Sequence, residues 1–440
     1  METYHPHLML PNEIERCAGE ITTEESNVRT VFLTLFCFLL ALAPASAAGT
    51  VKTAIILFED NFGKLTDDQI ITLSNEFNMV MSAQWKFDIL AANERAASLK
   101  RENSTVILLA FVSSVFLREK QSQYDECNSE EDLFAHSAYP YTSEHRITTV
   151  DLDYYLMDVS NKEWSDKIIS WYSSLSADWD GLILDHGGPH LLQENFSALP
   201  YGYSHSTHRS AMNNHLEYIE GQTDTIVIFN GMQFWDSYPQ YSADLNGGVI
   251  EGFALGPSHP TSDHEWIENC VNVFLQNSKK YCGAWPKHKD CFTTEERIFT
   301  LACYLLAMHN NSYYTLYQHP RGSLSWYPEY RLDIGVPLTT PSQLDDMLDV
   351  SGLYVRDFTK GKVLVNSSDS PKNYKLSRSY WKIEFSGGGL INNDGKYSGK
   401  ILSEEQPAGT VSLPAGSALI LSSYDQSKSD LKSPSKLQVK

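Results

Sequence analysis

We expect an α/β protein, a (β/α)8 TIM barrel followed by a small C-terminal antiparallel β-sandwich domain, and three observations predict this fold. Continuous Val/Ile/Leu runs alternate with amphipathic, helix-like stretches from residue 53 onward. Such runs are typical of parallel strands that helices cover on both faces. After about residue 350, short β-rich runs separated by Gly, Pro, Asn and Ser indicate a small antiparallel domain.

Six apolar runs are the expected barrel strands. In order they are TAIILFED (53–60), STVILLAFVSS (104–114), YYLMDVS (154–160), WDGLILDHGG (179–188), DTIVIFNGMQFW (224–235) and GGVIEGFAL (247–255). The helix candidates are NKEWSDKIISWYSSLSA (161–177), HRSAMNNHLEYIEGQ (208–222) and EERIFTLACYLLAMHNN (295–311). An open doubly wound sheet is the main alternative, but it would be expected to show a Gly-rich phosphate loop after its first strand, and FEDNFGKL is not one.

The same changes in residue composition divide the chain into four parts. They are a leader with a signal peptide or anchor (1–48), the (β/α)8 barrel (49–345), the β-sandwich domain (346–425) and a disordered tail (426–440).

The leader predicts secretion. The apolar run Val31–Ala48 follows Arg29 and ends in small residues around Ala45, which fits the hydrophobic region and cleavage site of a signal peptide at about residues 29–48. The run is at the short limit for spanning a bilayer and contains Pro44, so cleavage is favoured over an uncleaved anchor. We therefore expect a secreted or extracellular protein, with membrane contact only if the leader is retained.

Cysteine and asparagine patterns agree with an oxidising compartment. Five of the seven cysteines follow the leader, and Cys282 and Cys291 close a short loop whose spacing suits a disulfide. Four acceptor triplets for N-glycosylation begin at Asn103, Asn195, Asn310 and Asn366.

The formal net charge of −21 argues against a nucleic-acid partner, because binding to phosphates depends on Lys and Arg. The 24 Tyr and nine Trp would suit stacking on sugars, although large aromatic side chains also fill cores. We expect a carbohydrate substrate, no cofactor and no metal ion. The sequence gives no indication of the oligomeric state.

Polar side chains stand at the ends of the expected strands. They are Asp60, Asp158, Asp185, Asn230 and Glu251. In a parallel barrel the loops at the carboxyl ends of the strands form the open, reactive face, so this set is what an active face should contain.

Asp185 is the strongest catalytic candidate. His186 and two glycines flank it, and a carboxylate at the mouth of a strand suits attack on an electrophilic carbon, although it could instead cap a helix or form a loop ion pair. Glu251 is its natural partner, because glycoside cleavage generally needs two carboxyl groups facing each other across the scissile bond. The alternative for Glu251 is a buried, paired structural role.

The remaining candidates would hold the sugar. Asn230 could donate to a hydroxyl group, and Trp235 offers a stacking face. Asp60, Asp158 and His186 complete the expected substrate-binding set, although the sequence around Asp60 is also an ordinary turn composition.

A metal-dependent alternative comes from the histidines. His186 and His190 form one pair and His205 and His208 another, three residues apart, which on a helix could share a face and bind zinc. Polysaccharide deacetylases use a similar His–Ser–His motif with a different spacing and an accompanying Asp–Asp strand end, which this sequence lacks. No G-x-S-x-G elbow is present for a Ser nucleophile.

Several motifs, in their order, resemble one known family. They are YYLMDVSNKEW (154–164), DWDGLILD (178–185), VIFNG (227–231), GGVIEGFA (247–254), EYRLDIGVP (329–337) and LYVRDFTKGKVLVNSS (353–368). Together they are similar to the hypothetical glycoside-hydrolase-like family 15 of barrel glycosidases. The resemblance implies a (β/α)8 barrel with a trailing β-sandwich, and it gives Asp185, after the fourth strand, the role of nucleophile.

The sequence departs from the family at two of these motifs. His186 stands where such families commonly have Asn or Glu, and Asn366-Ser367 stands where Asn-Pro is frequent. The first difference bears on substrate choice and the second on a turn.

The function that follows is a secreted glycoside hydrolase that cleaves O-glycosidic bonds of an oligo- or polysaccharide with Asp185 as nucleophile and Glu251 as acid/base. The alternatives are a barrel that binds carbohydrate without cleaving it and, ranking below both, a metal-dependent polysaccharide deacetylase.

Overall fold

The computed structural model of the protein describes residues 51–58, 62–83, 89–119, 121–150, 154–191, 196–235, 245–256, 259–261, 263–288, 290–317 and 322–428. The leader, Asp60, Asn195 and the last 12 residues lie outside the described residues. Among the helices of the described ranges, none has the length and apolar character needed to cross a membrane.

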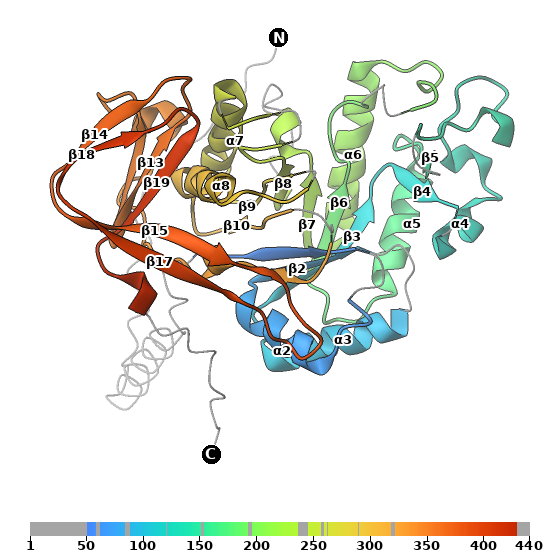
Figure 1. Cartoon of the computed structure of the whole chain (residues 1–440). Coiled ribbons are helices and arrows are strands. Elements are labelled where there is room, and N and C mark those ends of the chain that lie inside the picture. The colour runs from blue at the N-terminus through green and yellow to red at the C-terminus, as the bar shows by residue number, and fades with distance from the viewer. Residues whose placement is uncertain are drawn as a thin grey trace, which may run out of the picture. The chain divides into compact units, whose positions relative to one another are not determined.

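Eight parallel strands form one sheet, which confirms the predicted fold class (Figure 1). In spatial order they are β1 (Ala54–Leu57), β2 (Met79–Ala83), β3 (Ile107–Ser113), β6 (Gly181–Asp185), β7 (Ile226–Asn230), β8 (Gly247–Glu251), β9 (Tyr281–Trp285) and β10 (Ser312–Tyr314). A parallel bridge between Thr53 and Tyr314 brings β10 back beside β1, and the amide of Tyr314 donates to the carbonyl of Lys52 at 2.9 Å. The sheet is therefore a nearly closed barrel.

Helices connect the strands as the alternating pattern predicts. They are α2 (Asp67–Glu76), α3 (Ile89–Glu102), α5 (Lys162–Ser173), α6 (His205–Thr223), α7 (His264–Gln276) and α8 (Thr294–Ala307). Polar side chains define where these helices start: Thr66, Ser204 and Thr293 each form a capping box with the third helical residue, which satisfies amides that the first turn leaves unpaired.

One expected barrel strand lies elsewhere. The run YYLMDVS contributes β5 (Tyr154–Leu156), which pairs antiparallel with β4 (Phe116–Arg118) and lies outside the eight-stranded sheet. The two strands and the short helix α4 (Ser122–Cys127) belong to an insertion between β3 and α5. The prediction of a third barrel strand at 154–160 is therefore wrong, because an apolar run does not reveal which edge a strand pairs with.

The barrel interior is filled by alternate residues of each strand. Ile183, Ile228, Val249 and Trp285 share one buried cluster with residues of the other strands, whereas their immediate neighbours, such as Leu184 and Ile250, pack outward against the helices. At the amino-terminal ends of β8 and β9, Gly247 permits the two strands to approach closely, since a Cβ there would lie 1.9 Å from the carbonyl oxygen of Tyr281.

The C-terminal strands are antiparallel, as predicted. Five of them, β12 (Tyr354–Phe358), β13 (Gly361–Asn366), β19 (Ser417–Ser422), β15 (Tyr380–Gly387) and β17 (Gly399–Gln406), form one sheet in that order. Two more, β14 (Lys372–Leu376) and β18 (Gly409–Leu413), form a second sheet, and β16 (Gly389–Leu390) pairs with β11 (Ser325–Trp326). Leu364 and Leu421 of the first sheet share a core with Leu376 and Leu413 of the second, which is the packing of a small sandwich.

The five-stranded sheet is bound to the barrel through α8 (Figure 1). Arg356 of β12 is buried and its Nη1 donates to the carbonyls of Leu305, Leu306 and Met308 at 2.7–3.0 Å, which satisfies the unpaired carbonyl end of α8. In the first turn of α8, Arg297 forms a two-point ion pair with the fully buried Glu329.

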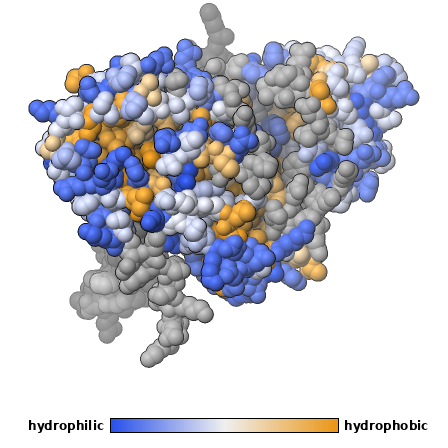
Figure 2. Space-filling model, in the orientation of Figure 1, coloured by the Kyte–Doolittle hydropathy of each residue, from blue (hydrophilic) through white to orange (hydrophobic). Residues whose placement is uncertain are grey.

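The segment between β15 and β17 extends along the barrel to α2 (Figure 1). Thr72 of α2 donates to the carbonyl of Gly395 at 2.9 Å, and the Tyr397 hydroxyl donates to Glu76 at 2.7 Å. On the face shown in Figure 2, the surface over α2 and α3 is mainly hydrophilic, as expected for helices that pack only one side on the sheet.

The expected disulfide between Cys282 and Cys291 is not formed. Cys282 is a buried residue of β9 that faces the helices, where its thiol donates to the carbonyl of Asn277 at 3.5 Å, whereas Cys291 is exposed. The prediction treated residues 281–292 as a loop, but their first five residues are a barrel strand.

Candidate functional site

Four polar side chains follow the inward-facing apolar residues of their strands, at the carboxyl end of the barrel. Asp185, Asn230 and Glu251 each come two residues after an interior side chain on β6, β7 and β8, and Lys287 does the same after β9. Because the side chains of a strand alternate with period two, all four are directed to the inside of the barrel at its carboxyl end.

Asn230 joins the two expected catalytic carboxylates. Its Nδ2 donates to Asp185 Oδ1 at 2.9 Å and to Glu251 Oε2 at 2.9 Å. The two accepting oxygens are therefore separated by no more than twice this distance. Asp185 and Asn230 are 8% and 7% exposed, so water does not replace this amide easily.

His186 turns back onto Asp185. Its backbone is in the left-handed region (φ 58°), which is uncommon for a residue with a Cβ, and its Nδ1 lies 2.9 Å from Asp185 Oδ2. Phe116 of β4 contacts the ring edge-on, with centroids 4.6 Å apart. Backbone strain that survives at a strand end is typical of functional sites.

The interaction between Asp185 and His186 favours the charged form of both side chains. Burial is the largest influence on Asp185 and opposes its ionisation, but the charge and hydrogen bond of His186, with the hydrogen bond from Asn230, outweigh burial and lower the pKa of Asp185. For His186 the surrounding protein opposes charge, yet Asp185 and then Glu251 outweigh this effect and raise the pKa. The His186 side chain is still 48% exposed, so it can meet a ligand.

Lys287 is a site residue that the sequence reasoning missed. Its Nζ donates to Glu251 Oε1 in an ion pair, and the same ammonium lies 5.7 Å from the ring centroid of Tyr317. The signal was present in the sequence YCGAWPK, where Lys287 follows Trp285 by two positions. It was lost because this stretch was interpreted as a disulfide loop instead of a strand.

Of the other expected sugar-binding residues, Asp158 is not part of this cluster. Asp158 follows β5 in the insertion, where its Oδ1 accepts from the amide of Ser160 at 2.9 Å and forms a turn before α5. Asp60 and the side chain of Trp235 lie outside the described residues, although the backbone of Trp235 ends a 3₁₀ turn, Met232–Trp235, after β7.

The histidine pairs do not assemble a metal centre. His205 and His208 begin α6, and the ring of His205 is 5.0 Å from that of His190. Across the described ranges, no three His, Cys, Asp or Glu side chains lie in an arrangement that could hold a metal ion. The deacetylase alternative therefore has no ligand set in this part of the chain.

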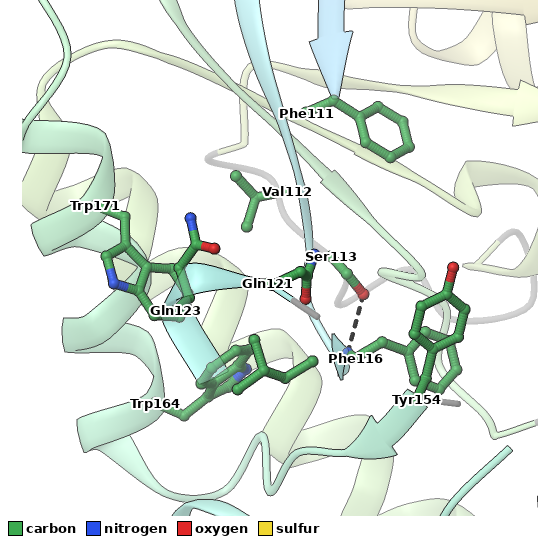
Figure 3. A pocket seen from close by; sticks show the side chains of 10 residues that line it. Phe111, Val112, Ser113, Phe116, Gln121, Gln123, Tyr154, Trp164 and Trp171 are labelled. Carbon is green, nitrogen blue, oxygen red and sulfur yellow. Dashed lines mark hydrogen bonds between the residues drawn. The ribbon is translucent and has the colours of Figure 1, made fainter. Parts of the chain in front are cut away.

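Figure 3 shows a small cavity beside the inserted hairpin, lined by Phe111, Trp164 and Tyr154 among others. In it Ser113 Oγ accepts from the amide of Phe116 at 2.9 Å. The volume is about 30 Å³, which suits one or two water molecules and excludes a sugar ring.

A parallel barrel with paired acids at the carboxyl ends of its strands has the architecture of the barrel glycoside hydrolases. The chain belongs to hypothetical glycosyl hydrolase family 15, whose model matches residues 105–362, more than half of the chain. This confirms the family that the motifs resemble and the class of enzyme.

Solved structures of glycoside hydrolases are similar at low identity. The glycoside hydrolase domain of PelA from Pseudomonas aeruginosa has 12% identity and a TM-score of 0.42, over 61% of this chain and 95% of that one. A GH31 dextranase of Flavobacterium johnsoniae in complex with glucose has 10% identity and a TM-score of 0.44, over 86% and 52%. An α-amylase of Geobacillus thermoleovorans has 9% identity and a TM-score of 0.38, over 84% and 97%. No curated protein matches the chain.

Proposed function

We propose that the protein hydrolyses O-glycosidic bonds of an oligo- or polysaccharide with Asp185 and Glu251 as its two catalytic carboxylates. One observation carries the proposal: a single amide, Asn230 Nδ2, donates to both carboxylates, which places two acids within reach of one glycosidic bond.

The environments of the two acids suit different roles. A nucleophile must be ionised, and the lowered pKa of Asp185 keeps it so at neutral pH. Glu251 is the acid/base, because its side chain is 30% exposed and its Oε2 faces the same space as Asp185 Oδ1. The ion pair with Lys287 must loosen when the leaving-group oxygen arrives, since a general acid has to carry a proton.

The spacing favours retention of anomeric configuration. Retaining enzymes hold the two carboxyl groups about 5–5.5 Å apart and inverting enzymes about 6.5–9.5 Å. The two oxygens bonded to Asn230 are each 2.9 Å from its nitrogen, so these two atoms are at most about 5.8 Å apart, which is nearer to the retaining spacing than to the inverting one. Asp185 would then form a covalent glycosyl–enzyme intermediate, which water resolves with Glu251 acting as base.

The test is hydrolysis of reducing-end-labelled α- and β-linked oligosaccharides by the wild-type chain and by Asp185→Asn and Glu251→Gln. We expect each variant to lose activity by about 10³-fold or more with its fold intact. Asp180→Asn is a matched control, because Asp180 precedes the same strand at the opposite end of the barrel, where it accepts from Lys100 and the amide of Leu108. Equal activity in Asp185→Asn and wild type would refute the proposal.

Two further outcomes separate the alternatives. Saccharide binding that survives in Asp185→Asn, with no turnover of any glycan by the wild type, would identify a carbohydrate-binding barrel instead. For an active enzyme, NMR of the first product anomer distinguishes retention from inversion.

We also propose that the chain is exported and glycosylated. The apolar leader Val31–Ala48 and the exposed acceptor Asn310 support this. Asn366 is fully buried and its Nδ2 donates to three carbonyls, those of Ser370, Leu413 and Pro414, so it should stay unmodified. Mass spectrometry of the chain from a secretory host would show a new N-terminus near Ala48 and a glycan on Asn310 only if the proposal holds.

A further inference from the structure

A second cavity, which we call the insertion cavity, lies apart from the carboxylate cluster. It has a volume of about 490 Å³, within the range of small-molecule sites. The cavity is lined by Asp132, residues 134–136 and 156–161 of the insertion, the loop 200–203 and the first turns of α6. None of Asp185, Asn230, Glu251 or Lys287 lines it.

Aromatic faces form part of its wall. Tyr141 stacks on His136 with centroids 4.9 Å apart and an angle of 17° between the rings, which fixes its orientation. Tyr201 also lines the cavity and is 65% exposed. Exposed, oriented aromatic rings are the surfaces on which the apolar faces of sugars pack.

Hydrogen-bonding groups without partners lie in the same wall. Asp158 uses Oδ1 for the turn at Ser160, and Oδ2 makes no hydrogen bond within the described residues. His208 is 9% exposed, and its Nε2 is buried without a partner in the described part of the chain. Burial, with His190 and His205 nearby, lowers the pKa of His208 to about 4, so the ring is neutral at pH 7.

The charge of the wall excludes anionic ligands. Asp132 and Asp158 line the cavity, and no Lys or Arg is among its described lining residues. Arg146, which stacks on the buried face of Phe134, is already paired with Glu131. A ligand with hydroxyl donors and no negative group fits this chemistry.

We propose that the insertion cavity is a second saccharide-binding site that holds a non-anionic stretch of a polymeric substrate away from the point of cleavage. The hairpin of β4 and β5 links the two sites: Phe116 contacts His186 at the barrel mouth and stacks on Tyr154, and Leu156 of the same strand lines the cavity. Its contribution to cleavage rests on the proposed hydrolase function, whereas saccharide binding does not.

The test uses the full chain with Asp185→Asn, so that bound sugars stay intact. Neutral hexasaccharides of α-1,4-glucan, β-1,4-glucan, β-1,3-glucan, β-1,4-mannan and β-1,4-N-acetylglucosamine, together with hexagalacturonate as an anionic probe, are titrated by calorimetry. We expect at least one neutral hexasaccharide to bind and hexagalacturonate not to bind. The bound hexasaccharide should lose affinity by about tenfold or more when Asp158→Asn and Tyr201→Ala are added.

These two variants are chosen to keep the fold. Asn at position 158 can still accept from Ser160, and Tyr201 has an exposed side chain. Tyr139→Ala is the matched control, because Tyr139 is 75% exposed in the same insertion, touches Tyr141 and does not line the cavity. Thermal midpoints of all variants within about 2 °C of the parent confirm that binding and not folding is measured.

A crystal structure of Asp185→Asn with the tightest hexasaccharide completes the test. Sugar in the insertion cavity supports the proposal. Sugar only at the barrel mouth, unchanged affinity in the double variant, or no binding of any neutral probe overturns it. Binding in the cavity without hydrolysis by the wild type would refute the proposed function and leave this site standing.

Discussion

Replacing Asn230 with Leu removes the amide that donates to both Asp185 and Glu251 while keeping a side chain of similar size. Each lost hydrogen bond to a charged acceptor is worth about 1.5–3 kcal/mol. Glu251 is partly exposed and can recover a bond from water, but Asp185 is 8% exposed and cannot. We therefore expect Asn230→Leu to lower the free energy of unfolding by about 3 kcal/mol at pH 7.

The cost should depend on pH in a defined direction. The folded-state pKa of Asp185 is lowered, so its ionised form contributes stability above its unfolded pKa of about 3.9, and that contribution is lost as the pH falls through the folded value. Asn230 is one cause of the lowering. The destabilisation by Asn230→Leu should therefore be largest near pH 7 and shrink towards pH 3.

Urea denaturation of wild type and Asn230→Leu at both pH values measures this effect. Asn246→Leu is the matched control: Asn246 Oδ1 accepts from the amide of Val227 at 2.7 Å, at the other end of the barrel and between neutral groups. Its cost should be about 1–2 kcal/mol and independent of pH. An equal cost of Asn230→Leu at pH 7 and pH 3, or a cost below about 1 kcal/mol at pH 7, would refute the reasoning.

Three further predictions follow from other groups. Asp185→Asn should bring the pKa of His186 down, because the carboxylate that raises it is gone and the surrounding protein still opposes charge; NMR titration of the ring protons checks this, and an unchanged value contradicts it. His208 binds a proton in the unfolded chain below about pH 6.5 but in the folded protein only near pH 4, so the free energy of unfolding falls on acidification. His208→Asn should remove about 2.5 kcal/mol of the loss between pH 7 and pH 4.5, as measured by urea denaturation. Glu329→Gln leaves Arg297 as a buried, unpaired charge and should cost about 3–5 kcal/mol of unfolding free energy, and a cost below about 1 kcal/mol would show that the pair is not structural.

The strands that composition revealed are those that contain at least two consecutive Val, Ile or Leu residues. β3, β6, β7 and β8 are of this kind, and their order and helices were enough to predict the barrel. β9 has the sequence YCGAW, without a run of large apolar residues. A Cβ at Gly283 would lie 2.4 Å from the Val249 side chain, so packing in the barrel requires Gly at the position where an apolar residue would have marked a strand. β10 has three residues, too few for a pattern.

The sequence could not predict which strands pair with one another, and the physical reason is a different one. β5 and β6 both read as apolar runs, but one is bonded antiparallel in an insertion and the other parallel in the barrel. The alternation of side chains is the same in both arrangements. Asp158 was therefore assigned to the barrel mouth, although it lines the insertion cavity.

Reactive side chains of a parallel barrel lie at the carboxyl ends of its strands, and this principle was enough to predict the positions of Asp185, Asn230 and Glu251. It did not predict which of these side chains contact one another. That Asn230 lies between the two acids depends on the register of β6, β7 and β8, in which Leu184 pairs with Phe229 and Asn230 with Val249. Register is set by the packing of the whole barrel and leaves no local trace. The catalytic roles of the two acids remain a proposal that the hydrolysis assays decide.

The residue type at position 230 follows from the charges around it. Two carboxylates whose bonded oxygens are each 2.9 Å from one point repel each other, and a third carboxylate at that point would add to the repulsion. A lysine would satisfy both acids, but Lys287 already neutralises Glu251 and His186 already lies on Asp185, so a third cation would be in excess. A neutral amide with two N–H donors joins the acids without adding charge. Asn230→Asp should therefore be more harmful to stability at neutral pH than Asn230→Leu, and the opposite order in urea denaturation would contradict this account of position 230.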